Sequence, residues 1–280
     1  MTCRSILVLL DPCPVASTVI GSAISLAKTL DCHLRGLALT DHIGAPPAPK
    51  PSDSDKERSA RVSDSFRDQA ERIVEQFRSA CRIAGLRSFD AVIDEGHKVD
   101  ALLRHSRGCD LTVLAQGERF GQDRLETLAM LEAVVLQSAR PTLLLPASGV
   151  FAGEARNVMV AWNDSREALR AVSDALPLLQ KATDVEIVHW NVGPSMTDMA
   201  LHARLDALRQ WLVWHGVPTR TAIEVAGSNL ASVMNSKAAL SRADLIVMGA
   251  YGRPRGAERV LGGATRDMLE SMSVPVLLSH

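Results

Sequence analysis

Four glycines near the carboxyl end of the sequence have a spacing that suits the binding of a phosphate group. Gly249 and Gly252 follow the apolar run 245–248, and Gly262 and Gly263 stand just before a predicted helix. Glycine lets backbone N–H groups approach an anion closely, and the amino end of a helix adds a favourable partial positive charge. The chemistry predicted here is the cradling of a phosphate chain by backbone amides.

The residues around these glycines support that prediction only as a group. Ala264 and Thr265 precede the predicted helix 266–272, so that their amides are free donors. Positive charge nearby comes from Arg253, Arg255, Arg259 and Arg266. A solvated surface explains the arginines alone equally well, and glycines alone are also common in turns that bind nothing. Their combination in one segment favours a binding site.

Strands and helices alternate along both halves of the chain. Apolar strands are expected in the second half at 158–162, 185–190, 220–225 and 245–248, with amphipathic helices at 165–181, 196–215 and 229–241. The first half repeats the pattern, with strands near 5–10, 34–39, 89–94, 111–115 and 142–145. This order predicts α/β architecture, in which parallel sheets are covered by helices on both faces.

An internal repeat divides the chain of 280 residues into two parts. The run that begins at Arg4 matches the run at Arg156, and the run at Pro141 matches that at Pro275. The first part is longer, mainly because of residues 43–60, whose Pro, Ser and charge content predicts an exposed loop or disordered insert. We therefore predict domains at 1–148, with the insert, and at 149–280, joined by the small residues 147–155.

In an open parallel sheet, ligands bind beyond the carboxyl ends of the strands where the winding direction reverses. In the second half the loop after the first strand contains Asn163 and Ser165, and the loop after the fourth strand begins near Gly249. If the winding reverses between these two strands, both loops face one crevice.

Composition argues against several classes of function. The net charge of −1 and the pI near 6.7 provide no field for gathering nucleic acid or anionic lipid. Apolar runs such as 6–10 are far shorter than the about 20 residues that span a bilayer. The amino terminus lacks a secretory signal pattern, so we expect a cytoplasmic protein. Five cysteines, all in the first half and without CxxC spacing, predict reduced thiols.

The glycine pattern resembles the ATP-binding signature of the universal stress protein family. Two residues separate Gly249 from Gly252, and nine separate Gly252 from Gly262. The resemblance covers both halves, so that the chain is similar to a tandem member of the family. It implies two doubly wound, Rossmann-like sheets of five parallel strands in the order 3-2-1-4-5.

The resemblance also implies the nucleotide contacts. Asn163 would face adenine and ribose, the Trp190 backbone would contact adenine, and the glycines would lie against ribose and phosphates. The predicted nucleotide site comprises Asn163, Trp190, Met248, Gly249, Gly252, Arg253, Gly262, Gly263, Ala264 and Thr265. The implied ligand is ATP or a related adenine nucleotide, with or without Mg²⁺.

Two departures from the family pattern predict weaker binding without its loss. The family often has Asp at the position of Asn163, and it has Ser or Thr where this chain has Gly263. The first half departs further, because Ala115, Glu118 and Leu128 stand where the second half has glycines. A carboxylate there repels phosphate, so we interpret the first half as a scaffold or as a site for another ligand.

Three functions follow from this pattern. The leading hypothesis is a stress-response regulatory protein that binds nucleotide in its second domain, with little or no catalysis. The alternatives are an interaction module that no longer binds nucleotide, and an enzyme that hydrolyses ATP or transfers a nucleotidyl group. No catalytic group is evident beside the glycines, and the histidines have no metal-binding spacing.

The expected partners are consistent with a small-molecule regulator. In the family the fifth strands of two domains pair, so residues 143–145 and 276–278 would join the two halves as an intramolecular pseudo-dimer. A homodimer of the whole chain is a further expectation. We expect neither a nucleic acid nor a membrane as a partner.

Overall fold

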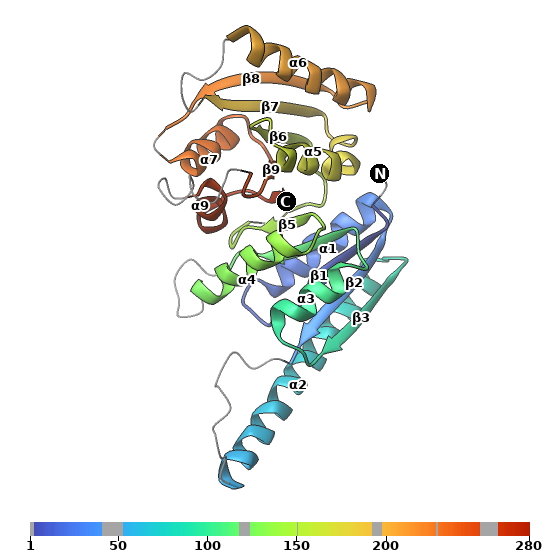
Figure 1. The fold of residues 1–280 in the computed structure, drawn as a ribbon. Coiled ribbons are helices and arrows are strands. Elements are labelled where there is room, and N and C mark those ends of the chain that lie inside the picture. Colours follow the sequence, from blue (N-terminus) through green and yellow to red (C-terminus); the bar gives the residue numbers. More distant parts are fainter. Residues whose placement is uncertain are drawn as a thin grey trace.

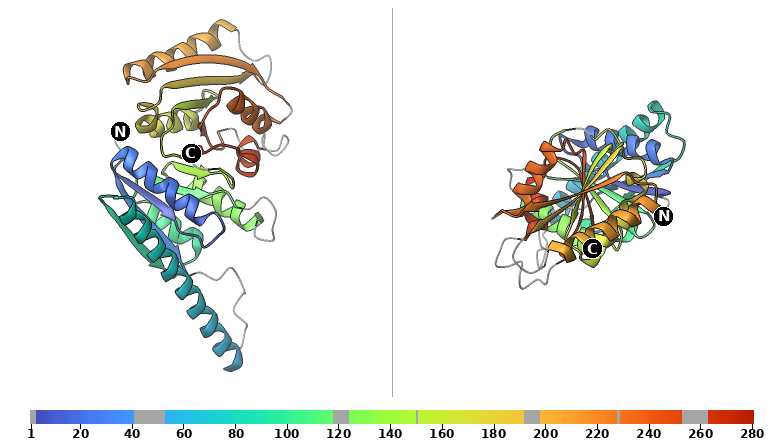
Figure 2. Two further views of the ribbon diagram at one scale, coloured as in Figure 1. Left: turned by 180° about the vertical axis from the view of Figure 1, so that it is seen from behind. Right: turned by 90° about the horizontal axis from the view of Figure 1, so that it is seen from above.

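The computed structural model describes residues 3–40, 53–117, 124–149, 151–191, 198–227, 229–252 and 263–280. Within them the chain forms one ten-stranded sheet with helices packed on both faces (Figure 1). Seen from above, the strands fan about a common centre as a twisted sheet, and the helices surround them (Figure 2).

The helices and strands alternate in each half as the sequence pattern predicts. The first half contains β1 (Ser5–Leu9), α1 (Ala16–Leu30), β2 (His33–Leu39), α2 (Asp53–Ile83), β3 (Phe89–Asp94), α3 (Lys98–Ser106), β4 (Leu111–Ala115), α4 (Arg124–Gln137) and β5 (Thr142–Leu145). The second half contains β6 (Asn157–Trp162), α5 (Arg166–Leu179), β7 (Asp184–Asn191), α6 (Asp198–Trp214), β8 (Thr219–Val225), α7 (Leu230–Leu240), β9 (Leu245–Gly249), α9 (Ala264–Ser271) and β10 (Val276–Ser279).

The strand order is β3-β2-β1-β4-β5-β10-β9-β6-β7-β8. Each half is therefore a doubly wound, five-stranded parallel unit in the order 3-2-1-4-5, which confirms the predicted fold class. The winding reverses between β1 and β4 in the first half and between β6 and β9 in the second. Each reversal is a place where a sheet of this kind binds ligands.

The two halves join through their fifth strands. β5 and β10 pair antiparallel, with Val276 opposite Leu144 and Leu278 opposite Thr142. The pairing predicted from the family resemblance is thus present within one chain. Polar contacts reinforce it, because the Gln116 side-chain amide donates to the Leu269 carbonyl at 2.8 Å.

The core has two layers, one on each face of the sheet. Ile6 and Val8 of β1 enter one layer, whereas Leu7 and Leu9 enter the other. Strands that are buried on both faces need apolar side chains at every position, which explains why they read as continuous apolar runs. Both layers include residues from each half, so the two halves share their hydrophobic core.

The segment between the halves is packed rather than free. Phe151 and Ala155 are buried, and Gly153 has φ +80°. A Cβ on Gly153 would lie 2.4 Å from the backbone carbonyl carbon of Ser25, so the segment crosses α1 at a distance that only glycine allows. This contact fixes the connection against the first half.

The predicted insert at 43–60 is helical in its second part. Helix α2 begins at Asp53, so residues 53–60 are its first turns, while 43–52 lie outside the described residues. These first turns project beyond the sheet and its other helices (Figure 1).

Two further features concern the thiols and the helices. All five cysteines are free thiols, in agreement with the expectation of reduced cysteines. In the part of the chain that the structure describes, no helix combines the length and the apolar character that a membrane span requires.

Candidate functional site

The second-half reversal point lies beyond the carboxyl ends of β6 and β9. These strands are parallel neighbours, with Ala161 opposite Met248. The loop that contains Asn163 and the loop that begins at Ala250 therefore leave the same edge of the sheet. The structure brings these two predicted loops together as the sequence argument requires.

Gly249 is where the first turn of α5 rests on β9. A Cβ on Gly249 would lie 2.4 Å from the backbone nitrogen of Ala168 and 2.6 Å from the carbonyl carbon of Glu167. Real Cβ atoms do not approach backbone this closely, so any side chain here would push the helix away. Gly249 therefore has a packing role in the structure. Its predicted contact with a ligand stays a prediction.

The loop after β6 is held by two short polar contacts. The Asn163 side-chain oxygen accepts from the Ser165 amide at 3.2 Å, and the Ser165 hydroxyl accepts from the Ala168 amide at 3.1 Å. Ser165 is therefore the N-cap of α5. A Cβ on Gly252 would lie 2.7 Å from the Ser165 hydroxyl oxygen, so this loop and the glycine segment are in contact.

Glu167 places a buried carboxylate at this reversal point, and the sequence reasoning missed it. The residue is 6% exposed, and one carboxylate oxygen would lie 3.1 Å from a Cβ on Gly252. Burial alone would raise the pKa of Glu167, but hydrogen bonds from Arg166, from its own backbone N–H and from Ser165 hold the pKa below its ordinary value. An acidic residue two positions after a Ser cap was the available signal.

The amino end of α9 faces the same edge. Gly263 is the N-cap and makes no side-chain cap hydrogen bond, and Ala264 and Thr265 begin the helix. The Thr265 side chain is 3% exposed, and its hydroxyl accepts from the Tyr251 amide at 3.0 Å. Thr265 therefore ties the loop after β9 to α9, and only its hydroxyl hydrogen is left to donate to a ligand.

Asp267 adds an acidic group to the first turn of α9. Its carboxylate accepts from the Asn229 side-chain amide at 3.3 Å. Burial and the nearby Glu270 raise the pKa of Asp267, whereas Arg266 opposes that shift. Asp267 thus places a carboxyl group in the first turn of α9, near the positive end of the helix dipole.

Trp190 and Met248 lie in the core beneath the edge. Both residues are buried, and the contact predicted for Trp190 is one through its backbone. Within the described residues, the Trp190 indole nitrogen has no hydrogen-bond partner. Arg253 and Gly262, the remaining predicted site residues, lie outside the residues that the structure describes.

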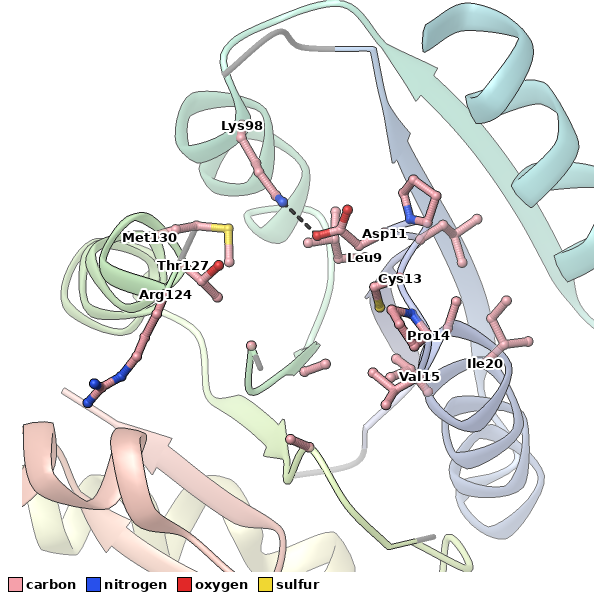
Figure 3. A pocket seen from close by; sticks show the side chains of 17 residues that line it. Leu9, Asp11, Cys13, Pro14, Val15, Ile20, Lys98, Arg124, Thr127 and Met130 are labelled. Carbon is pink, nitrogen blue, oxygen red and sulfur yellow. Dashed lines mark hydrogen bonds and ion pairs between the residues drawn. The ribbon is translucent and has the colours of Figure 1, made fainter. Parts of the chain in front are cut away.

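The first half has a cavity of about 500 Å³ at its own reversal point (Figure 3). Val15 at the start of α1 faces Thr127 and Met130 of α4 across it. Lys98 and Asp11 line it as well and form an ion pair of 2.6 Å. We call this space the first-half cavity; its polar lining includes Asp11, Cys13, Lys98, Arg124 and Thr127, and its apolar lining includes Leu9, Val15, Val19, Ile20, Ala115 and Met130.

Two local differences account for the cavity. Ala115 of β4 corresponds to Gly249, and its methyl group prevents the close approach that α5 makes to β9. Helix α1 also begins at Ala16, which corresponds to Ala168 inside α5, so that Pro14, at the position of the first residue of α5, precedes the helix. The first helix thus starts later and farther from the sheet. Of the other first-half positions, Leu128 is buried and Glu118 lies outside the described residues.

Comparison with known proteins identifies the second half. Residues 154–280 match the model of the universal stress protein family. The second half belongs to the universal stress protein family. No curated protein sequence matches the chain.

Solved structures extend the likeness to both halves. A universal stress protein from Archaeoglobus fulgidus DSM 4304 has 17% identity and a TM-score of 0.77, covering 99% of this chain and 96% of that one. A functionally unknown protein from Pseudomonas aeruginosa PAO1 has 16% identity and a TM-score of 0.58, covering 99% and 92%. The first half therefore matches these structures as well, although the family model matches only the second half.

The same fold serves other proteins as well. The cytoplasmic domain of a prokaryotic cation chloride cotransporter matches with 13% identity and a TM-score of 0.51, covering 99% of this chain and 95% of that one. Fold alone therefore does not determine what a tandem universal stress protein architecture does. Function depends on the residues at the two reversal points.

Proposed function

We propose that this protein is a stress-response regulator whose second half binds ATP or a related adenine nucleotide. The observation that carries the proposal is the reversal between β6 and β9, which brings Asn163, Gly252 and the uncapped amino end of α9 to one edge. This edge lies within the part of the chain that matches the universal stress protein family. Nucleotide binding there is a regulatory signal, and catalysis is not required.

The position of the Glu167 carboxylate leads us to include Mg²⁺ in the proposed ligand. Its ionised carboxylate lies beside Gly252, where it would repel an uncompensated triphosphate. Mg²⁺ is commonly held by one or two carboxylates together with the phosphates of a nucleotide. A single carboxylate with the Ser165 hydroxyl nearby fits that role, so the proposed ligand is the Mg²⁺ complex of the nucleotide.

Isothermal titration of the whole protein with ATP tests this function. We expect binding at micromolar to millimolar nucleotide in the presence of Mg²⁺ and weaker binding in EDTA. Gly252→Glu adds a carboxylate beside Glu167 and is expected to abolish binding. Gly21→Glu is the matched control, because Gly21 is exposed on α1 and a Cβ there would meet no other atom within 4 Å.

The absence of binding in wild-type protein at millimolar ATP would overturn the proposal. Nucleotide that stays bound through purification, identified by mass spectrometry, would support it independently. Equal loss of binding in Gly252→Glu and Gly21→Glu would indicate a general defect rather than a site at the β6–β9 edge.

Hydrolysis is expected to be slow. The lowered pKa of Glu167 makes its carboxylate a weak base. Product formation from labelled ATP, lost on Gly262→Val, would instead support an ATP hydrolase or nucleotidyl transferase.

Exposed apolar residues near the two ends of the edge strand β8 favour an interaction module as the other candidate. Helix α6 ends at Trp214, which is 75% exposed, and the edge strand β8 ends at Val225, which is 84% exposed. Exposed apolar groups beside a sheet edge are typical of contact surfaces. Partners captured equally by wild-type protein and Gly252→Glu would favour this function, whereas partner exchange that depends on ATP would favour the regulator.

A further inference from the structure

The first-half cavity is a binding site that the nucleotide proposal leaves unused. Its volume of about 500 Å³ lies in the usual range for small-molecule pockets, and it occupies the reversal point where sheets of this kind bind ligands. We propose that it binds a small monocarboxylic acid, with the apolar body between α1 and α4 and the carboxylate beside Lys98.

The walls of the cavity suit an apolar body. Val19 and Ile20 of α1 line one side, and Met130 of α4 lines the other. These three side chains are otherwise buried in the protein, so the surface that they present to the cavity is held in place by the core. An unbranched or aromatic apolar group that fills the space removes this surface from water.

Lys98 and Asp11 lie together at one end of the cavity (Figure 3). The Lys98 ammonium lies 2.6 Å from an Asp11 carboxylate oxygen, and the two side chains are 21% and 47% exposed. Because Asp11 is half exposed, it can turn toward solvent at little cost when a ligand carboxylate approaches Lys98. Lys98 reaches into the cavity from the start of α3 (Figure 3).

The second half shows which group is missing from the first. There, the Ser165 hydroxyl accepts from the Ala168 amide, and the Glu167 carboxylate accepts from its own backbone N–H. The residues at the equivalent positions are Cys13 and Val15, and α1 makes no side-chain cap hydrogen bond. The chain thus carries its own carboxylate at the start of α5, whereas the start of α1 has an apolar side chain and an open space.

A monocarboxylate fits this space better than a nucleotide does. When Asp11 turns toward solvent, Lys98 offers one positive charge, which a single ligand carboxylate already balances. Arg124, the other cation of the lining, already forms an ion pair with Glu270 of the second half. The Ala115 methyl stands where the second half has Gly249, so a phosphate chain could not approach the end of this strand as closely.

Calorimetry with octanoate as the probe tests the proposal on the whole protein. Octanoate is expected to bind, and octanol and octyl phosphate are expected to bind at least tenfold more weakly. ATP should not displace octanoate. If octanol bound as tightly as octanoate, Lys98 would have no role in binding. If ATP displaced octanoate, the cavity would be a nucleotide site. Either result would overturn the proposal.

Variants separate a specific site from adsorption to an apolar surface. Lys98→Gln is expected to lower octanoate affinity at least tenfold, and Val15→Glu, which copies Glu167, is expected to abolish binding. Lys181→Gln removes an exposed lysine of the second half and should change nothing. Binding that survives unchanged in both Lys98→Gln and Val15→Glu would refute the site.

A filling variant guards against a folding defect. Met130→Trp adds bulk inside the cavity and should prevent octanoate binding while the circular dichroism spectrum and the second-half response to ATP stay as in wild type. Octanoate binding by a folded Met130→Trp protein would contradict the proposed location. Gly252→Glu should leave octanoate binding intact, so that failure of the nucleotide proposal and failure of this one are distinguishable.

Discussion

The two reversal points of this protein occupy equivalent places in the fold but are filled differently. In the second half, Gly249 allows α5 to rest on β9, and Ser165 and Glu167 occupy the space at the helix start. In the first half, the Ala115 methyl and the late start of α1 leave a cavity of about 500 Å³. Among the described residues, Ser165 and Glu167 stand at the start of α5, whereas the equivalent residues Cys13 and Val15 line an open space.

This difference shows that a glycine at the end of a strand has two distinct uses. It can let a ligand approach the backbone, or it can let the protein's own helix do so. Gly249 serves the second use in this structure, whereas Gly252 lies between the helix start and the open edge. The glycine spacing alone therefore does not show whether a ligand or the protein's own helix approaches the backbone.

The largest expected effect comes from giving Gly249 a side chain. Gly249→Val places atoms where the backbone of Ala168 lies, so it should lower the free energy of unfolding by about 3 kcal/mol or more, as severe overpacking does. Ala115→Val, the matched change in the first half, points into a cavity and should cost less than about 1 kcal/mol.

Urea unfolding followed by tryptophan fluorescence measures both variants. All four tryptophans lie in the second half, so the signal reports on the region that Gly249→Val disturbs. Circular dichroism follows the whole molecule and shows whether the halves unfold together, as their shared core predicts. Similar losses in the two variants would contradict the proposed contrast between a filled and an open reversal point.

The fold was largely predictable because its signals are local. The central strands, such as β1, β4, β6 and β9, are apolar runs of a length typical of buried parallel strands, and the matching runs at Arg4 and Arg156 indicate the repeat. The antiparallel pairing of β5 with β10 was also predicted, although from the family resemblance rather than from the residues themselves. Residues 53–60 were the exception, because their charge and Ser content suit an exposed helix as well as a loop.

The filling of the two reversal points was less predictable because it depends on distances between elements. The sequence contains Gly249 and Ala115. It does not show that α5 contacts Gly249 whereas α1 leaves a cavity beside Ala115. Pro14 was no signal that α1 starts late, because it stands at the position of the first residue of α5, where proline is compatible with a helix start. The only signal for the burial of Glu167 was its distance from the Ser165 cap.

A smaller effect, with a pH dependence, is expected from Glu167→Gln. The folded pKa of Glu167 lies below its unfolded value near 4.5, so its carboxylate contributes stability above that pH and loses it as the pH falls. Replacing it should cost about 1–2 kcal/mol at neutral pH, because the hydrogen bonds from Arg166 and the helix start lose their charged acceptor.

Urea midpoints of wild type and Glu167→Gln should therefore converge as the pH is lowered from about 6 to 3. Other carboxylates with lowered pKa values, such as Asp94, are present in both proteins, so they cancel in the difference. Val15→Glu is the reciprocal change and should stabilise the start of α1 modestly above pH 5, by about 0.3–1 kcal/mol. A difference between wild type and Glu167→Gln that stays constant with pH would show that the carboxylate acts through packing and not through charge.

The smallest effect is expected from the helix caps themselves. Ser165→Ala removes the acceptor of the Ala168 amide and should cost about 1 kcal/mol, the usual loss for an N-cap hydroxyl. Cys13→Ala changes the equivalent residue of the first half, but α1 makes no side-chain cap hydrogen bond, so the cost should be at most half as large. Urea midpoints at neutral pH measure both changes, and octanoate titration of Cys13→Ala checks that the cavity keeps its ligand. If Cys13→Ala were the more destabilising variant, the start of α1 would depend on the thiol, and the contrast between a capped and an uncapped reversal point would be wrong.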